Sequence, residues 1–536
     1  MKRRHFILSS MMAGAALGIN ACKPKGQGLE EDSKSDVANK FDLEEITVQD
    51  LQNKMTEGEL TSEQITQLYI DRIKKVDQVM TKAVVELNPD ALMIAQELDK
   101  ERKEGKVRGP LHGIPVLIKD NINTGDKMIT SAGSLAFISH KASGDAFIIS
   151  QLREAGMVLL GKTNLSEWAN FRSTNSSSGW SGRGGQTRNP YVLDRTPCGS
   201  SSGSAVAVSA NLAPLAIGTE TDGSIVCPSG INGIVGIKPT VGAWSRSGII
   251  PISESQDTAG PMARTVKDAA LLLRALVGKD DADEATNKQP DNFGIYLNFD
   301  EFALEGSRIG YLKQVSAFDT RVSAIMDEVV QTLKDKGADV IEVETDDELK
   351  QLGQHEWTVL QCEFKDGINK YLAAHPGLPY KTLTDLIEFN KKNATKEMPW
   401  FGQEIFELCD QTNGLEDEKY KESIKKCKEL SQTKGIDKLI DKYKLDALMA
   451  PTNGSAWVID FVNGDNFKGG SSQLAAVSGY PSVTVPAGDI KGLPIGVSFF
   501  GKAWTESRLI QLSYAYELAS KKRIVPAFKT SLLDEA

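Results

Sequence analysis

Residues 198–226 read CGSSSGSAVAVSANLAPLAIGTETDGSIV, in which two serine- and glycine-rich turns flank a helical run over Ser204–Leu212. They belong to a longer stretch, residues 164–262, in which Gly, Ser, Thr and Asn dominate. Backbone this polar makes a poor core, and in folded enzymes it more often forms loops around a cleft. The segment therefore predicts a cleft built from loops.

On both sides of this segment, strands alternate with helices. Thr61-Ser-Glu-Gln64 resembles a capping box and begins an amphipathic pattern, which predicts a helix over residues 61–78. The alternation predicts a layered α/β architecture. The other predicted helices cover residues 89–104 and 146–155, and the predicted strands cover 114–118, 158–160, 446–450, 482–485 and 495–500.

Residues 280–445 are rich in Lys, Glu and Asp and carry helical periods, as in Ile424–Tyr443. They predict exposed helices that cover one side of the molecule. Two interpretations stay open for this region: a solvated face without a role, and a lid that faces the substrate.

Composition limits the classes of partner. The chain has 536 residues, 40 % of them hydrophobic, which is ample for a large core. Its formal net charge of −10 argues against nucleic acid and anionic membrane as main partners. No apolar run reaches the length of about eighteen residues that spans a membrane.

The first 22 residues predict a signal peptide. Met1–His5 is basic, Phe6–Ile19 is apolar but too short to span a bilayer, and Arg3-Arg4 fits a twin-arginine signal. Ala21-Cys22 resembles a lipoprotein processing site with Cys22 as the lipid attachment, although Asn20 is not the usual small residue. We therefore expect an exported, periplasmic or membrane-anchored protein, with a flexible linker over 23–42 and a catalytic domain over 43–530.

The cysteines lie at positions 22, 198, 227, 362, 409 and 427. With Cys22 lipidated the other five cannot all pair, no CxxC is present, and the five histidines are scattered. We therefore expect no disulfide framework and no metal site, and we interpret Cys227 as a small buried thiol.

Lys119 directly follows the apolar run Ile114–Ile118. Burying an ammonium group is costly without partners, so the position is unusual. A lysine that snorkels from a strand end is the ordinary interpretation, and serine-glycine clusters alone usually mark turns.

Together these motifs resemble the amidase signature family, over roughly residues 45–525. The resemblance implies a three-layer α/β/α fold with a large mixed central sheet flanked by helices, and an enzyme without a cofactor. It rests on GPLHGIPVLIKDNI (109–122), CGSSSGSAVAVSANLAPLAIGTETDGSIVCPS (198–229), GIVGIKPT (233–240), DTAGPMART (257–265) and GLPIGVSFFG (492–501).

The resemblance also implies a catalytic triad. Ser224 is the nucleophile, Ser200 follows a cis peptide bond and relays a proton, and Lys119 is the base. A serine hydroxyl is a weak nucleophile until a base takes its proton, and burial makes a lysine suitable by lowering its pKa. Hydrolysis of a carboxamide then passes through an acyl-enzyme and releases ammonia and a carboxylate. Main-chain N–H groups of Thr221, Asp222, Gly223 and Ser224 are expected to form the oxyanion hole.

Two positions depart from the common family pattern, Asp222 in place of a glycine and Glu220 in place of an aspartate. The same departure occurs in the bacterial peptide amidase branch, so the expected substrate is a small-molecule amide or a C-terminal peptide amide. A carboxylate beside an anionic intermediate is unfavourable. We therefore expect Asp222 either to point away or, with Ser200, to contact the substrate.

Other functions stay open. Gly199-Ser-Ser201-Ser-Gly203 matches a nucleophile elbow, which would make Ser201 the nucleophile of an esterase and would need His355 or His375 downstream. An exported peptide-binding lipoprotein without turnover and a glutaminase component of an amidotransferase are the remaining alternatives. His112 is interpreted as structural.

Overall fold

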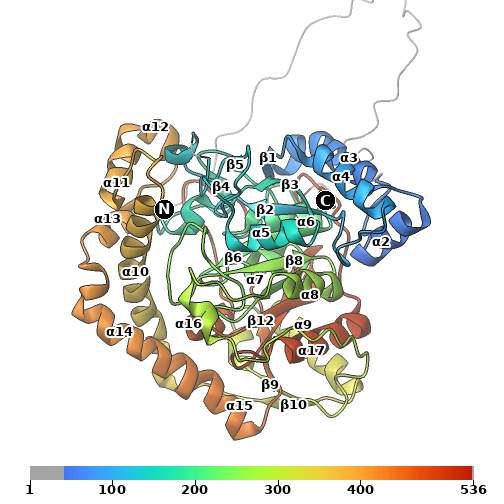
Figure 1. Ribbon diagram of the computed structural model, residues 1–536. Helices are drawn as coiled ribbons and strands as arrows, with labels where there is room; N and C mark the ends of the chain where they lie inside the picture. Colours follow the sequence, from blue (N-terminus) through green and yellow to red (C-terminus); the bar gives the residue numbers. More distant parts are fainter. Residues whose placement is uncertain (1–40, 140, 534–536) are drawn as a thin grey trace, which may run out of the picture.

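The computed structural model describes residues 41–139 and 141–533 (Figure 1). The predicted signal peptide, Cys22 and the linker up to residue 40 lie outside the described residues. Within them, no helix combines the length and the apolar composition that crossing a membrane requires.

The second of the first three helices begins at the predicted capping box. Helix α2 covers Val48–Glu57, α3 covers Ser62–Arg72 and α4 covers Ala91–Lys103. The Thr61 side chain accepts a hydrogen bond from the Gln64 N–H, and the Gln64 side chain accepts one from the Thr61 N–H. The helix predicted to reach residue 78 instead continues from α3 as a π-helix over Ile73–Thr81.

The central feature is a mixed sheet of eleven strands in the order β1-β3-β2-β6-β8-β7-β12-β13-β11-β9-β10. Its strands are β1 Val84–Leu87, β2 Pro115–Lys119, β3 Val158–Thr163, β6 Leu215–Glu220, β7 Val235–Lys238, β8 Thr258–Ala263, β9 Arg308–Tyr311, β10 Asp339–Glu342, β11 Ala447–Pro451, β12 Ser482–Ile490 and β13 Leu493–Phe500. A separate hairpin pairs β4 Trp180–Ser181 with β5 Gly185–Gln186.

The neighbouring strands β2 and β6 run parallel, with Ile118 opposite Ile217. Their carboxyl ends therefore lie at the same edge of the sheet, where open α/β sheets bind their ligands. Lys119 ends β2 and Glu220 ends β6, so the lysine lies beside the turn that leads to Ser224.

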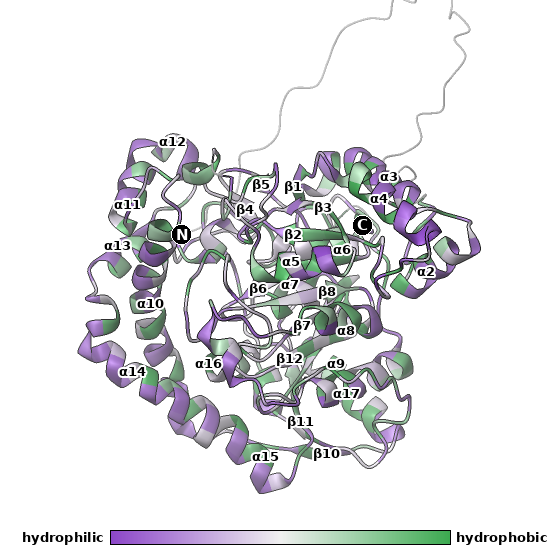
Figure 2. Ribbon diagram, in the orientation of Figure 1, coloured by the Kyte–Doolittle hydropathy of each residue, from purple (hydrophilic) through white to green (hydrophobic). Residues whose placement is uncertain are grey.

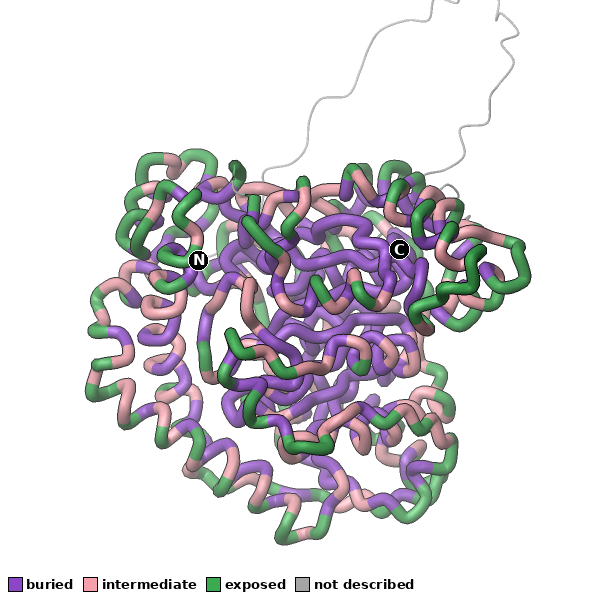
Figure 3. Tube along the Cα trace, viewed as in Figure 1, coloured by how far each residue is buried: buried purple, intermediate pink, exposed green. Residues whose placement is uncertain are grey.

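Helices cover both faces of the sheet. Every residue of β2, β3, β6, β7 and β8 is therefore buried (Figure 3). Helices α6 Ser202–Ser209 and α7 Val226–Ile231 contact each other and the sheet. A second group on the sheet consists of α8 Val266–Ala275, α9 Thr320–Asp335 and α17 Glu506–Ser520, while α5 covers Phe147–Glu154. The predicted layered α/β fold is confirmed.

Residues 352–443 of the charged region form an arc of helices along one side of the sheet (Figure 1). The expectation of exposed helices throughout 280–445 is wrong for residues 308–342, which form strands β9 and β10 of the sheet and helix α9. The helices of the arc mix hydrophilic and hydrophobic residues along their length (Figure 2), as amphipathic helices do. The predicted helix Ile424–Tyr443 is divided by a π-helix, Glu429–Ile436, with a kink at Gly435. The helices are α10 Leu352–Ala374, α11 Leu383–Lys392, α12 Ala394–Glu397, α13 Glu404–Asp410, α14 Glu418–Lys428 and α15 Asp437–Tyr443, with α16 Ser472–Ser478 further along the chain.

A buried arginine connects this arc to the part of the chain that carries the serines. The Arg172 guanidinium is fully buried, with its Nε 2.8 Å from Glu167 Oε1. Its Nη1 donates to the main-chain oxygen of Gly402, at 2.9 Å, between α12 and α13. The Gly402 hydrogen bond therefore joins the arc to the buried Arg172.

Candidate active site

The Lys119 side chain is fully buried among oxygen atoms that carry no formal charge. Its Nζ lies 2.8 Å from Ser200 Oγ and 3.0 Å from Ser201 Oγ. It also lies 2.8 Å from Thr219 Oγ1 and 3.1 Å from the Thr219 carbonyl oxygen. The lysine is therefore held by two serines of one turn and by the end of strand β6.

Burial lowers the pKa of Lys119 to about 7, because it penalises the charged ammonium form. The more distant carboxylates of Asp257 and Glu220 act in the opposite direction and raise it. An amine with this pKa is substantially neutral at neutral pH and has a lone pair that accepts a proton. The ordinary interpretation of Lys119, a lysine that snorkels to solvent, is wrong.

Ser200 lies between the lysine and a cavity. The peptide bond between Gly199 and Ser200 is cis, as the resemblance implies. The Ser200 carbonyl oxygen accepts a hydrogen bond from the Ser166 N–H at 3.1 Å. Ser200 also lines the cavity, so its hydroxyl has Lys119 on one side and open space near the other.

Ser224 lies in the turn between β6 and α7 and is 9 % exposed. Its carbonyl oxygen accepts a hydrogen bond from the Ser201 N–H at 3.1 Å, which joins the two serine turns directly. Glu220 stabilises the start of α7, because its Oε2 accepts from the N–H groups of Ile225 at 2.7 Å and Val226 at 3.0 Å.

The turn requires a glycine at position 223. Its φ of +76° is a backbone conformation in which any residue with a side chain is strained, and a Cβ there would lie 3.1 Å from Ser472 Oγ. Among the residues that the structure describes, none accepts a hydrogen bond from the main-chain N–H groups of Asp222, Gly223 or Ser224. These donors are thus available to a ligand.

A cavity of about 480 Å³ opens beside this turn. Ser200, Thr219 and Thr221 line the cavity, whereas Asp222, Gly223 and Ser224, which follow Thr221 in the chain, are not among its lining residues. Its apolar walls come mainly from one loop and from helix α10. They are formed by Ala169, Ile249, Ile250, Pro251, Ile252, Tyr371 and Ala374.

The cavity also contains residues that sequence analysis missed. Asp257 accepts hydrogen bonds from the Thr221 hydroxyl at 2.5 Å and from the N–H groups of Ile252 at 2.8 Å and Ser253 at 2.9 Å. It belongs to the DTAGPMART motif, so the sequence contained a signal that could have identified it. His375 lies at the end of α10 and gave no such signal, because only the fold brings it to this wall.

The Asp222 side chain does not line the cavity. It lies beside Glu356 of α10 and the Ser472 hydroxyl. Of the two expectations for Asp222, this placement favours the one in which the carboxyl points away from the substrate.

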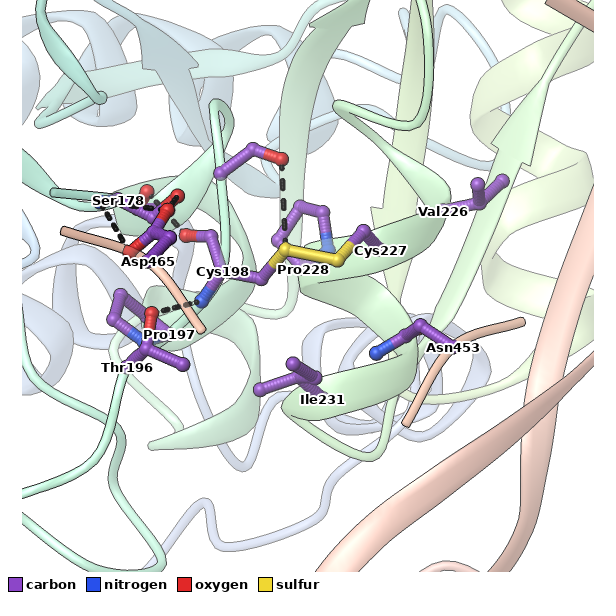
Figure 4. Close-up of a disulfide and its surroundings, with 12 residues drawn as sticks. Ser178, Thr196, Pro197, Cys198, Val226, Cys227, Pro228, Ile231, Asn453 and Asp465 are labelled. Carbon is purple, nitrogen blue, oxygen red and sulfur yellow. Dashed lines mark hydrogen bonds between the residues drawn. A yellow bond between two sulfur atoms is a disulfide. The ribbon is translucent and has the colours of Figure 1, made fainter. Parts of the chain in front are cut away.

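Two cysteines that we expected to be free form a disulfide. Cys198 lies just before Ser200, and Cys227 lies in α7 just after Ser224 (Figure 4). The expectation of a free Cys227 thiol is wrong, because a 29-residue separation does not reveal that the fold brings the two Cα atoms within 6.2 Å. Cys362, Cys409 and Cys427 are buried thiols.

The nucleophile-elbow alternative has no structural support. Ser201 Oγ donates to the Thr219 carbonyl oxygen at 2.9 Å and contacts Lys119, and its neighbours include no imidazole. His112 is buried with its Nε2 2.9 Å from the Leu98 carbonyl oxygen, which fits its structural interpretation. In the described part of the chain, no group of three or more His, Cys, Asp or Glu residues is placed to hold a metal ion.

Comparisons with known proteins cover nearly the whole chain. The family model for amidases matches residues 64–510. A probable amidase of Arabidopsis thaliana is 41 % identical over 503 residues, covering 92 % of this chain and 93 % of that protein. A putative amidase of Schizosaccharomyces pombe is 40 % identical over 520 residues, covering 91 % of this chain and 87 % of that protein.

A solved structure extends this agreement to three dimensions. The native peptide amidase from Stenotrophomonas maltophilia superposes with a TM-score of 0.88 at 50 % identity and covers 91 % of this chain and 100 % of that one. The matched model and relatives span the sheet, the buried lysine and both serine turns. The chain therefore belongs to the amidase signature family and is a hydrolase that acts on amides.

Proposed function

We propose that this enzyme hydrolyses C-terminal amides of short peptides through a Ser224–Ser200–Lys119 triad and an acyl-enzyme. The observation that carries the proposal is the buried Lys119 amine, 2.8 Å from Ser200 Oγ, with a pKa lowered to about 7. A neutral amine in contact with a serine hydroxyl is a ready proton acceptor.

In the first half of the reaction, Ser200 passes its proton to Lys119 and takes the proton of Ser224. The Ser224 oxygen attacks the carboxamide carbon, and the carbonyl oxygen becomes an oxyanion. We expect the N–H groups of Asp222, Gly223 and Ser224, which bind no described acceptor, to stabilise that oxyanion together with the neighbouring Thr221. One such donor contributes about 3 kcal/mol to the transition state.

In the second half, the proton returns from Lys119 through Ser200 to the amide nitrogen. The C–N bond breaks, ammonia leaves, and the acyl group stays on Ser224. Water, deprotonated through the same relay, attacks the ester and releases a carboxylate. In this scheme Ser200, which lines the cavity, serves both the nucleophile and the leaving group.

The cavity supports a peptide amide as substrate. Its volume of about 480 Å³ lies within the usual range for small-ligand sites, and its apolar walls suit an uncharged side chain. Four of its lining residues carry carboxylates, namely Asp257, Asp283, Glu254 and Glu284, whereas Arg246 and Lys370 supply the cationic side chains. This excess of negative charge disfavours peptides that end in a free carboxylate. The 50 % identical relative is a peptide amidase.

The test is ammonia release from dipeptide amides and from the corresponding free dipeptides. We expect release from the amides only, and we expect Ser224→Ala and Lys119→Ala to lower kcat/KM by at least about a thousandfold. Ser202→Ala is the matched control, because Ser202 belongs to the same serine run but donates to the Cys198 carbonyl oxygen. Full activity of Ser224→Ala would rule out the proposed nucleophile.

We also propose that the protein is exported and lipidated at Cys22. The basic, then apolar N-terminus supports export, and the Cys198–Cys227 disulfide suits an oxidising compartment. We expect the native protein to fractionate with membranes and Cys22→Ala to become soluble. Equal partitioning of the two proteins would contradict lipidation.

A further inference from the structure

Glu356 connects the helical arc to the turn that carries Ser224. It lies on α10, 5 % exposed, and both of its oxygens accept hydrogen bonds from amides. Gln256 Nε2 donates to Oε1 at 3.0 Å, and Gln473 Nε2 donates to Oε2 at 2.8 Å. Gln256 also donates to the Thr221 carbonyl oxygen at 3.3 Å, so the network reaches the backbone of the turn.

The Asp222 carboxyl, two residues before Ser224, meets this network. It lies beside Glu356 and Ser472, and its buried Oδ1 receives no hydrogen bond from any described N–H or hydroxyl group. Two ionised carboxylates repel each other at such a contact. A single proton shared by the pair removes the repulsion and supplies the missing hydrogen bond.

The hydrogen bonds decide which carboxyl holds the proton. Burial raises the pKa of both carboxyls, but Glu356 receives an amide hydrogen bond at each oxygen, which favours its ionised form. Asp222 has no comparable set of donors, and burial together with the neighbouring Glu356 raises its pKa. The proton therefore belongs on Asp222, which donates to Glu356.

Other charged groups face the pair from three further elements. Lys238 of β7 lowers the pKa of Asp222, and Glu220 of β6 adds a second carboxyl nearby. Burial lowers the pKa of Lys238 to about 8, and its Nζ donates to the Tyr480 carbonyl oxygen at 2.7 Å. The Cys427 thiol of α14 faces Glu356.

We propose that Glu356 is a positioning residue that keeps Asp222 protonated and thereby keeps negative charge away from the oxyanion formed beside Ser224. This rests on the proposed triad and deepens it. It also gives the helical arc a part in the chemistry, because α10 supplies the residue. As pH rises, Asp222 ionises and the rate of acylation falls.

The experiment measures kcat/KM against pH for wild type, Glu356→Gln, Asp222→Asn and the double variant. A glutamine amide at position 356 can donate to an ionised Asp222, so Glu356→Gln should lower kcat/KM at neutral pH by at least about tenfold. Adding Asp222→Asn removes the charge and should restore most of that loss. In Asp222→Asn alone, the decline above neutral pH should disappear.

The matched control is His355→Gln, at the adjacent position of α10, where the ring contacts Ser423 and faces away from the turn. Its kcat/KM and pH profile should equal those of wild type. Unchanged activity of Glu356→Gln, or a loss that Asp222→Asn does not restore, would overturn the proposal. Failure of the proposed function looks different, because wild type itself would then release no ammonia from peptide amides.

Discussion

The Lys119 amine contacts only uncharged oxygens, and this isolation from carboxylates sets its chemistry. An ammonium in contact with Asp or Glu would keep its proton at neutral pH. Here the contacts are hydroxyls and one carbonyl oxygen, so burial dominates and lowers the pKa to about 7. The proposed base therefore owes its low pKa to the absence of carboxylates from its direct contacts.

The first prediction concerns the acid side of the pH profile. Lys119 acts only when neutral, so kcat/KM should fall about tenfold per pH unit below a midpoint near pH 7. Stopped assays of ammonia release between pH 5 and 9, with folding checked by circular dichroism, measure this. A rate that stays level down to pH 5 would contradict a lysine base.

A second prediction concerns Asp257, whose charge raises the pKa of Lys119. Asp257→Asn removes that charge, so the acid midpoint should move to lower pH. The amide also loses one of the acceptor positions that hold Thr221, Ile252 and Ser253, so kcat/KM at pH 8 should fall about tenfold. The acid midpoint of Ser202→Ala should stay at the wild-type value, and an unmoved midpoint in Asp257→Asn would contradict the electrostatic effect.

At the scale of elements, the parallel pair β2 and β6 brings the lysine to the serine turns. Both strands are short and apolar, and their carboxyl ends meet at one edge. The turn after β6 then leads directly into α7, whose first N–H groups are held by Glu220. The proximity of Lys119 to the serine turns therefore depends on the positions at which β2 and β6 end.

The disulfide between the serine turns should stabilise the same region. It closes a loop between Cys198 and Cys227, a separation of 29 residues. A loop of this size corresponds to roughly 3.6 kcal/mol of stability. A variant with both cysteines replaced by serine should lose about that much free energy of unfolding in urea. Equal unfolding midpoints of wild type with and without reductant would contradict this.

Sequence patterns predicted the elements that depend on nearby residues. The capping box at Thr61 and the apolar run before Lys119 are local signals, and both appear in the fold. Sequence patterns could not identify Glu356 and His375 as neighbours of the site, because both come from α10 or its end, far along the chain. The π-helix after α3 was also missed, since its residues fit an ordinary helical period.

At the scale of the whole molecule, the sheet and the arc of helices contribute different parts of the site. The sheet edge carries the proposed triad, whereas α10 supplies part of the cavity wall and the partner of Asp222. Of the two interpretations left open for residues 280–445, the substrate-facing one fits α10.

The charge at the cavity mouth predicts a preference for cationic substrates. Arg246 is paired with Asp283 at 2.6 Å and Lys370 with Asp366 at 2.7 Å. Among the described residues, Glu254 and Glu284 have no ion-pair partner. Dipeptide amides with a free ammonium should therefore show a KM several-fold below that of their N-acetylated forms, and salt should narrow the difference.

Glu284→Gln should raise KM for the free-amine substrate and leave KM for the acetylated one unchanged. Equal KM values for both substrates in wild type would contradict the electrostatic preference.

The disulfide also bears on the order of events as the protein matures. An unfolded chain exposes five thiols besides Cys22, and Cys198 could then pair with any of the others. In the folded chain, Cys362, Cys409 and Cys427 are hidden in helices α10, α13 and α14, and Cys198 faces Cys227. If the chain folds before it is oxidised, only Cys198 and Cys227 are positioned to pair, and no disulfide rearrangement is needed. The disulfide then forms within a fold that is already complete.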